Sequence, residues 1–271
     1  MSIGNKKALL IGINYIGSKY ELNGCINDVG SLKNKLKLLG FNDIKTLTDD
    51  NNYKPTKNNM LLEIKNLLES SNNNDILFIA YSGHGSNIID KSGDEQDGFD
   101  EMIIPCDFDP ISDDMFKDYI SKYIKKNVTL YGLFDCCNSG SILDLKYQYL
   151  DSNNYNNIYI NNTISNINNN ILIISGCMDN QTSADALINN KYQGAMTWSF
   201  LQVLEKYPNI NLKDLLLYMR KILKENNYTQ IPQLSSNTII NINNNYFLKK
   251  IHKKNINYFL KKIHKKILIN F

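Results

Sequence analysis

The sequence predicts an α/β fold with a mostly parallel sheet, and two observations support this class. Four short, nearly continuous apolar runs rich in Ile and Leu have the composition of strands that are buried on both faces. Segments in which apolar residues recur at helical spacing lie between these runs. Because strand and helix patterns alternate along the chain, we expect helices to pack against a parallel sheet.

Each predicted strand is bounded by Gly, Asn or Asp, which favour turns. The four strands are expected at residues 6–13, 75–81, 127–135 and 171–176. A shorter apolar segment near the end of the domain predicts one further strand at residues 238–242.

Five helices are predicted between and after the strands. They are expected at residues 29–39, 60–68, 115–124, 195–206 and 212–224. Gly40 ends the first helix, since glycine readily follows a helix C-terminus. Asn211 and Asp214 suit the start of the last one, because short polar side chains cap free amide groups and acids favour that end.

The composition of the 271 residues is that of a globular protein, with 42% hydrophobic and 21% charged residues. The net charge is +3, but the segment 245–271 holds eight lysines and no acid, so the rest of the chain is net negative. An acidic body without a basic stripe argues against nucleic acid as a partner.

The C-terminal segment contains an identical decapeptide, NYFLKKIHKK, at residues 245–254 and again at 257–266. One interpretation is a basic amphipathic arm that contacts acidic surfaces or an anionic membrane. The other is a dispensable, partly helical tail.

The cysteines and the N-terminus predict an intracellular, cytoplasmic protein. Five cysteines, an odd and scattered number, are expected to be reduced thiols rather than a disulfide framework. The first apolar run is short and is interrupted by Gly12 and Asn14, which argues against a secretory signal. No window approaches the ~20 apolar residues of a membrane span, and we expect a monomer without a transmembrane segment.

The residues that can carry chemistry follow two of the predicted strands. His84, in YSGHGS, is the sole histidine outside the tail, and the next strand ends in Asp135, Cys136 and Cys137. Functional residues gather at the carboxyl ends of strands in α/β sheets, and a Cys with a His can form a nucleophile with its acid/base partner. The alternative is a turn histidine with two structural cysteines, whereas the spacing does not suit a zinc site.

At these residues the sequence resembles the metacaspases, the caspase-like cysteine peptidases. The matching segments, in the order of the family, are ALLIGINY, ELNGCINDV, YSGHGS, DEQDGFDEMIIPCDF, SDD, LFDCCNSGSILDL, ISGCMDNQTSAD, GAMTWSF and QIPQLS. The resemblance covers nearly all of residues 6–243 and implies a caspase-like three-layer α/β/α sandwich. Only MSIGNK precedes the first strand, so we expect the type I-like form without a prodomain.

The resemblance also implies a domain organisation. A peptidase domain is expected at residues 1–244, followed by the basic tail at 245–271. Within the domain, residues 1–144 correspond to a large-subunit-like part, 145–170 to a linker and 171–244 to a small-subunit-like part.

The roles of the site residues follow from the same match. His84 is implied to be the general acid/base and Cys137 the nucleophile, and the backbone N–H groups of Gly85 and Cys137 are the expected oxyanion-hole donors. The family cleaves after Arg or Lys, so the substrates are proteins or peptides with such a residue at P1. The positions that match its specificity pocket are Cys25, Asp28, Ser82 and Asp135. A cationic side chain removed from water needs a fixed carboxylate partner.

Some members of the family need calcium, and the resemblance implies a Ca²⁺ site here. The matching positions are Asp100, Asp113, Asp114 and Asp144. Calcium prefers several oxygen ligands, and these four aspartates come from separate places in the chain. The alternative is that the acidic stretch is a solvated loop.

Self-processing is the last property that the resemblance implies. Lys146 is the sole basic residue of the polar 145–170 linker, and exposed linkers are where proteolysis concentrates. We therefore expect autocatalytic cleavage after Lys146.

One departure keeps alternative functions open, because Asn138 stands where the family usually has a histidine. The first interpretation is an active endopeptidase that cleaves after Arg or Lys. The second is a catalytically weak homologue that acts as a calcium-responsive regulatory or binding protein. The third, an asparagine-specific legumain-like peptidase, fits poorly with this N-terminus.

Overall fold

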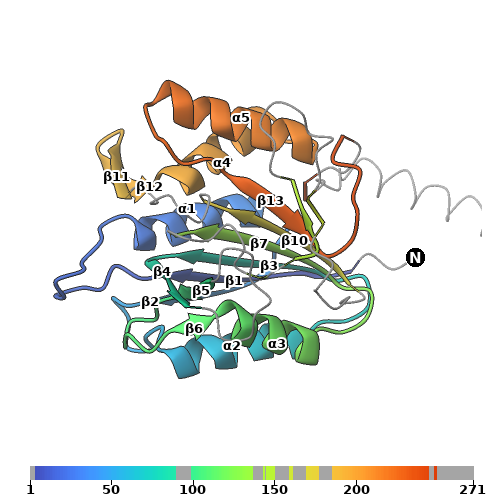
Figure 1. The fold of residues 1–271 in the computed structure, drawn as a ribbon, viewed down its shortest axis with the longest axis horizontal. Coiled ribbons are helices and arrows are strands. Elements are labelled where there is room, and N and C mark those ends of the chain that lie inside the picture. The colour runs from blue at the N-terminus through green and yellow to red at the C-terminus, as the bar shows by residue number, and fades with distance from the viewer. Residues whose placement is uncertain are drawn as a thin grey trace, which may run out of the picture.

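An eight-stranded sheet forms the centre of the fold in the computed structural model of the chain (Figure 1). The structure describes residues 4–89, 99–136, 143, 145–149, 159–160, 169–176, 185–243 and 247–248. The strands of this sheet are β1 (Lys6–Gly12), β2 (Asp43–Thr48), β3 (Ile76–Ser82), β7 (Thr129–Asp135), β8 (Tyr147–Gln148), β9 (Tyr159–Ile160), β10 (Asn170–Ser175) and β13 (Gln233–Ser236). Their order is β2-β1-β3-β7-β10-β13-β8-β9. The first five in this order are parallel, and the last three pair antiparallel.

Two smaller sheets decorate the central one. β4 (Gly85–Ile89), β5 (Phe99–Ile103) and β6 (Ile111–Ser112) form an antiparallel sheet that follows β3 directly. β11 (Asp185–Ile188) and β12 (Lys191–Gly194) form a hairpin.

Helices cover both faces of the central sheet (Figure 1). α1 (Cys25–Leu38), α4 (Ala195–Lys206) and α5 (Leu212–Glu225) pack on one face, and α2 (Lys57–Glu69) and α3 (Asp113–Tyr123) pack on the other. Side chains of β3 alternate between the two cores, since Phe78 faces the first and Leu77 and Ile79 face the second. The predicted α/β sandwich with a mostly parallel sheet is confirmed.

Side chains cap the starts of three helices. Thr56 accepts a hydrogen bond from the backbone of Asn59 at α2, and Ser112 accepts one from Met115 at α3. Asn211 accepts the N–H of Asp214 at 2.8 Å, as the sequence predicts. None of the helices in the described part of the chain is long and apolar enough to span a bilayer.

The strand predicted at 238–242 is wrong. The strand of this region is β13, which ends at Ser236, and Ile239 is 67% exposed. β13 pairs antiparallel with β10, so residues after Ser236 run toward the start of β10. Because β10 begins at Asn170, it offers no partner for a strand that continues to residue 242. The edge strand β2 is absent from the prediction because its residues alternate in burial rather than forming an apolar run.

Part of the predicted 145–170 linker belongs to the central sheet. β8 pairs with β13, and β9 pairs with β8. Leu145 and Tyr149, on either side of β8, are 3% and 2% exposed. These described residues therefore belong to the packed fold. The polar composition of the stretch gives no signal of the two short strands.

The described residues of the C-terminal repeat lie in the core. Phe247 and Leu248 are 3% and 1% exposed. The ring of Phe247 lies 4.9 Å from that of Tyr131 and 5.4 Å from that of Phe200. The first copy of the repeat thus contributes to the fold at a point where the sequence predicts a separate tail.

Candidate active site

The carboxyl ends of β3 and β7 place the predicted catalytic positions at one edge of the sheet. Ser82 and Asp135, the last residues of these strands, are paired in register. His84 lies two residues beyond Ser82, and Cys137 lies two residues beyond Asp135 in the sequence. Cys137 lies outside the described residues, so its contact with His84 stays a prediction that this register supports.

A backbone carbonyl orients the imidazole of His84. Its Nε2 lies 2.8 Å from the carbonyl oxygen of Tyr20. Because a carbonyl oxygen only accepts, Nε2 carries the proton in this contact and Nδ1 of the neutral ring keeps its lone pair. The ring of Tyr15 packs against the imidazole with centroids 4.6 Å apart. His84 is thus held in the tautomer whose Nδ1 can accept a proton from a thiol.

Two hydroxyl groups, those of Tyr15 and Tyr81, hold the backbone of His84, and we call these residues the tyrosine pair. The N–H of His84 donates to the Tyr15 hydroxyl at 2.8 Å, and its carbonyl accepts from the Tyr81 hydroxyl at 2.7 Å. Burial raises the pKa of both phenols well above the ordinary value, so both stay protonated at neutral pH. A Cβ on Gly83 would lie 2.6 Å from the Tyr81 hydroxyl, which is why glycine is needed there.

The backbone N–H of Gly85 is available for an oxyanion. Gly85 is opposite Ile103 in the β4–β5 ladder, and the N–H of Ile104 donates to the carbonyl of His84. In an antiparallel ladder this bond makes Gly85 and Ile103 a non-hydrogen-bonded pair. The N–H of Gly85 therefore points away from β5, as its predicted role requires.

Asp28 and Asp135, here called the acidic pair, are buried carboxylates from α1 and β7, 1% and 4% exposed. Asp28 accepts the hydroxyl of Ser82 at 2.7 Å and the backbone N–H of Gly194 at 3.0 Å. Asp135 accepts the backbone N–H of Thr197 at 2.8 Å. The structure thus brings together three of the four residues predicted to bind the substrate side chain.

Cys25, the fourth of these, is buried at the first position of α1, one turn before Asp28.

Gly194 lies close to both carboxylates of the acidic pair. A Cβ on this residue would lie 2.2 Å from Oδ2 of Asp135 and 2.8 Å from Oδ2 of Asp28. One oxygen of each carboxylate therefore lies close to the Cα of Gly194, where a larger side chain would not fit. Two like charges in this arrangement favour a nearby cation.

Asp135 has a second role at the start of α4. The N-cap position of this helix is Gly194, which has no side chain to cap the first turn. The N–H of Thr197 in that turn is instead satisfied by the Asp135 carboxylate. The same side chain thus caps a helix and belongs to the acidic pair.

Cys136 is not available to a substrate. Its side chain is 0% exposed and belongs to the core that packs under α2 and α3, together with the tyrosine pair. Of the two neighbouring cysteines, the buried one is therefore structural, which supports the assignment of Cys137 as the nucleophile.

The predicted calcium ligands do not form a cluster in the described part of the chain. Asp113 is buried, and its two carboxylate oxygens accept the N–H groups of Glu101 and Asp114 at 2.9 and 2.6 Å. Asp100 lies in β5, and Asp144 lies outside the described residues. Among the described residues no three acidic, histidine or cysteine side chains come close enough to hold a metal ion. Calcium binding stays a prediction.

Lys146, the predicted processing site, lies directly before β8. Tyr147 is paired with Ser236 of β13, and the ammonium of Lys146 lies 5.9 Å from the centre of the Tyr147 ring. The bond after Lys146 is thus at the start of a paired strand, so its cleavage requires the release of β8.

The sequence prediction did not include the tyrosine pair, Gly194 or Thr197. All four residues lie within segments that carry the resemblance: Tyr15 in ALLIGINY, Tyr81 in YSGHGS, and Gly194 and Thr197 in GAMTWSF. The roles of Tyr15, Gly194 and Thr197 depend on contacts with residues more than 60 positions away, which no local pattern reveals. Tyr81 contacts His84 only three positions further along the chain.

Comparisons with known proteins agree with the resemblance. Residues 6–146 match the family described as "Metacaspase, peptidase C14 domain". Metacaspase-1 of Meyerozyma guilliermondii is 36% identical to this chain, and the match covers 86% of this chain and 70% of the relative. Metacaspase-1 of Saccharomyces cerevisiae S288c is 37% identical over 89% of this chain and 68% of its own length.

A solved structure shares the fold. Protein GSU0716 from Geobacter sulfurreducens superimposes with a TM-score of 0.65 at 23% identity, covering 89% of this chain and 97% of that chain. At this level of identity the likeness concerns the fold alone.

Proposed function

This chain belongs to the metacaspase family of cysteine-type peptidases, and on that premise we propose that it cleaves peptide bonds after Arg or Lys with His84 and Cys137. The observation that carries the specificity is the acidic pair. Its two buried carboxylates both lie close to Gly194, at the sheet edge that also carries His84. A substrate cation that reaches both carboxylates gains two charge-assisted interactions in a site removed from water.

In the proposed reaction, Nδ1 of His84 takes the proton of the Cys137 thiol while Sγ attacks the carbonyl carbon of the P1 residue. The oxyanion that forms is stabilised by the N–H groups of Gly85 and Cys137. His84 then donates the proton to the leaving nitrogen, the C–N bond breaks and a thioester remains. Water hydrolyses the thioester, with His84 accepting the proton from water and returning it to the Cys137 sulfur.

The tyrosine pair supports this chemistry by fixing the backbone on both sides of the His84 side chain. The same backbone continues into Gly85, so the base and the oxyanion donor are positioned together. Preorganised groups of this kind need no rearrangement during the reaction.

Hydrolysis of fluorogenic peptides that differ in P1 (Arg, Lys, Asp or Asn) tests the proposal. We expect hydrolysis after Arg and Lys alone, and its loss in Cys137→Ala. Hydrolysis after Asn would instead support a legumain-like enzyme. No hydrolysis of any of the peptides would contradict the proposed activity.

We also propose that calcium activates the enzyme through Asp100, Asp113, Asp114 and Asp144. The same assay with and without Ca²⁺ tests this, together with calorimetry of the free protein, because an ion that binds the folded state also raises its stability. Asp114→Asn is the most suitable variant. Asp113→Asn would also alter two backbone hydrogen bonds. No heat of binding and no change in rate would contradict the proposal.

A further inference from the structure

Two kinds of side chain flank His84 on opposite faces of the sheet. The acidic pair lies on the face covered by α1 and α4, since its hydrogen bonds connect these helices to β3 and β7. Tyr15 belongs to the core under α2 and α3, on the other face. Its ring packs against Phe108, and Phe108 in turn packs against Tyr20. Tyr20 and Phe108, both exposed, are here called the aromatic patch.

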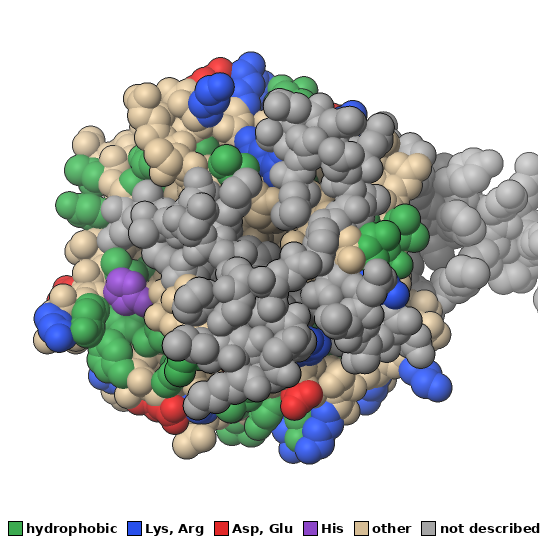
Figure 2. Space-filling view, in the orientation of Figure 1, with side chains coloured by type: hydrophobic (Ala, Val, Ile, Leu, Met, Phe, Trp, Pro, Cys, Tyr) green, Lys and Arg blue, Asp and Glu red, His purple; other side chains and the backbone are tan. Residues whose placement is uncertain are grey.

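The aromatic patch is exposed and close to the imidazole. Tyr20 and Phe108 are 51% and 46% exposed. The Tyr20 ring stands edge-on to the His84 ring at 6.2 Å, and the two patch rings are 5.9 Å apart. Phe108 also packs against Tyr15 at 5.7 Å. In Figure 2, green hydrophobic side chains border the outer side of the purple imidazole.

Phe108 is held in a backbone conformation that its side chain disfavours. Its φ is +59°, in the left-handed region that suits Gly or Asn. Most other non-glycine residues with positive φ in the described part of the chain are asparagines. A strained aromatic residue that stays half-exposed does not serve the core, and strain of this kind persists where the surroundings enforce it at functional sites.

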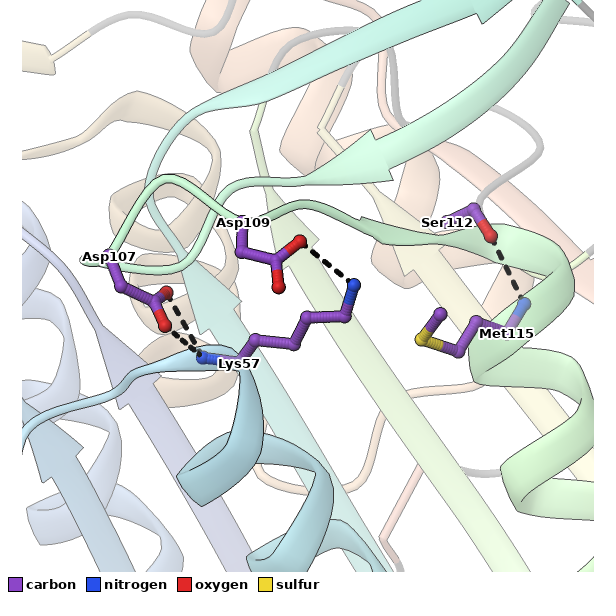
Figure 3. Close-up of polar contacts among 5 residues, drawn as sticks. All are labelled: Lys57, Asp107, Asp109, Ser112 and Met115. Atoms are coloured by element: carbon purple, nitrogen blue, oxygen red, sulfur yellow. Dashed lines mark hydrogen bonds and ion pairs between the residues drawn. The ribbon is translucent and has the colours of Figure 1, made fainter.

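Contacts with Lys57 hold the loop of Phe108 in this conformation (Figure 3). The two residues that flank Phe108, Asp107 and Asp109, both bind to Lys57. The Asp107 carboxylate accepts the backbone N–H of Lys57 at 3.1 Å, and Asp109 pairs with its ammonium at 2.9 Å. The loop is thus fastened to the start of α2 on both sides of the exposed ring.

The direction of the substrate follows from the chemistry. If the P1 side chain reaches the acidic pair, the scissile bond lies at the sheet edge beside His84. His84 must protonate the leaving nitrogen, so the leaving half of the peptide continues past the imidazole, away from the acidic pair. The aromatic patch is the surface that it meets there.

We propose that the aromatic patch is a subsite for an apolar side chain at P1′, the first residue of the leaving half. This inference rests on the proposed function and extends its specificity. A leucine or similar side chain removes apolar area of both rings from water, which favours binding. Lys19, whose ammonium lies 4.8 Å from the Tyr20 ring, would favour an acidic P1′ residue instead, and the experiment distinguishes the two.

The test uses internally quenched peptides with Arg at P1 and Leu, Ser or Asp at P1′. An Arg–aminocoumarin substrate, which has no primed residue, provides the reference rate. We expect kcat/KM for Leu to exceed that for Ser by about five- to tenfold, the effect of burying two or three methylene groups partly. In Phe108→Asn this ratio should approach one, whereas Phe108→Tyr should keep it.

Matched controls separate specificity from folding. Asn suits the left-handed backbone at position 108, so Phe108→Asn is expected to fold, and its Tm verifies this. Leu217→Asn removes an apolar side chain of similar exposure, 40%, from α5 and should keep the Leu preference. Preference for Asp at P1′, or an unchanged Leu-to-Ser ratio in Phe108→Asn, would overturn the inference.

A binding measurement keeps the inference independent of turnover. The same peptides, labelled with a fluorophore, are titrated with Cys137→Ala and with the double variant that also carries Phe108→Asn. If the Leu peptide binds Cys137→Ala more tightly than the Ser peptide does, and the double variant loses this difference, the subsite is supported. This holds even if the coumarin substrate is not hydrolysed, in which case the proposed activity alone fails. Equal binding of the Leu and Ser peptides would overturn the subsite.

Discussion

Replacing Asp135 separates substrate recognition from helix capping. In the unmodified protein the N–H of Thr197 lies 2.8 Å from the Asp135 carboxylate. Asp135→Asn removes the charge but keeps an oxygen that can accept this N–H. Asp135→Ala removes both. A charged partner left without its counter-charge in a buried site costs about 2 to 5 kcal/mol. Both variants should therefore lower kcat/KM for Arg substrates by roughly 30-fold to several thousand-fold.

The stabilities of the two variants should differ. Loss of a cap costs about 0.5 to 2 kcal/mol, which corresponds to a Tm about 1 to 8 °C lower in a domain of this size. This loss is expected for Asp135→Ala. Asp135→Asn keeps the cap and removes one of two like charges that lie close to Gly194, so its Tm should match or exceed that of the unmodified protein.

The assay is steady-state hydrolysis of Arg- and Gln-P1 peptides, combined with thermal unfolding of each variant. Asp118→Asn, an exposed position on α3, is the control. The reasoning is refuted if Asp135→Asn retains the Arg rate, or if it loses the Arg and Gln rates by the same factor. Equal Tm values for the Ala and Asn variants would refute the capping role.

Three further outcomes are expected. Tyr15→Phe removes the acceptor of the part-buried N–H of His84, which costs up to about 1 to 3 kcal/mol. It should lower kcat for coumarin substrates with little change in KM, whereas a purely structural role would lower the Tm without changing kcat. Cys137→Ala should be inactive, whereas Cys136→Ala should stay active with lower stability, because its side chain fills the core; the reverse result would reassign the nucleophile. Self-cleavage after Lys146 should create an N-terminus at Tyr147, found by sequencing the fragments, and should be slow because β8 must first detach; fragments in Cys137→Ala would exclude self-processing.

Much of the fold was predictable because buried parallel strands have an unmistakable composition. β1, β3, β7 and β10 are all apolar runs, and α4 matches its predicted bounds of 195–206. The short strands β8 and β9 and the edge strand β2 were not predicted. Such strands have one exposed face or only two residues, so their sequences resemble those of loops.

The candidate site was predictable in its residue types and only partly in its geometry. Chain order placed His84 and the Asp135–Cys137 segment after neighbouring strands, and the resemblance assigned their roles. The predicted nucleophile Cys137, the predicted calcium ligand Asp144 and the departure Asn138 lie outside the described residues.

The sequence by itself determined the class of fold, the edge of the sheet at which the predicted catalytic residues lie and the family to which the chain belongs. These properties depend on local composition and on motifs that are continuous in the chain. Only the tertiary structure decided that Gly194 lies close to the acidic pair, that Asp135 caps α4 and that two tyrosines from β3 and the loop after β1 hold His84. Apart from the bond between Tyr81 and His84, these contacts join segments far apart in the chain, and the packing of helices against the sheet, rather than any local preference, sets the distances between them.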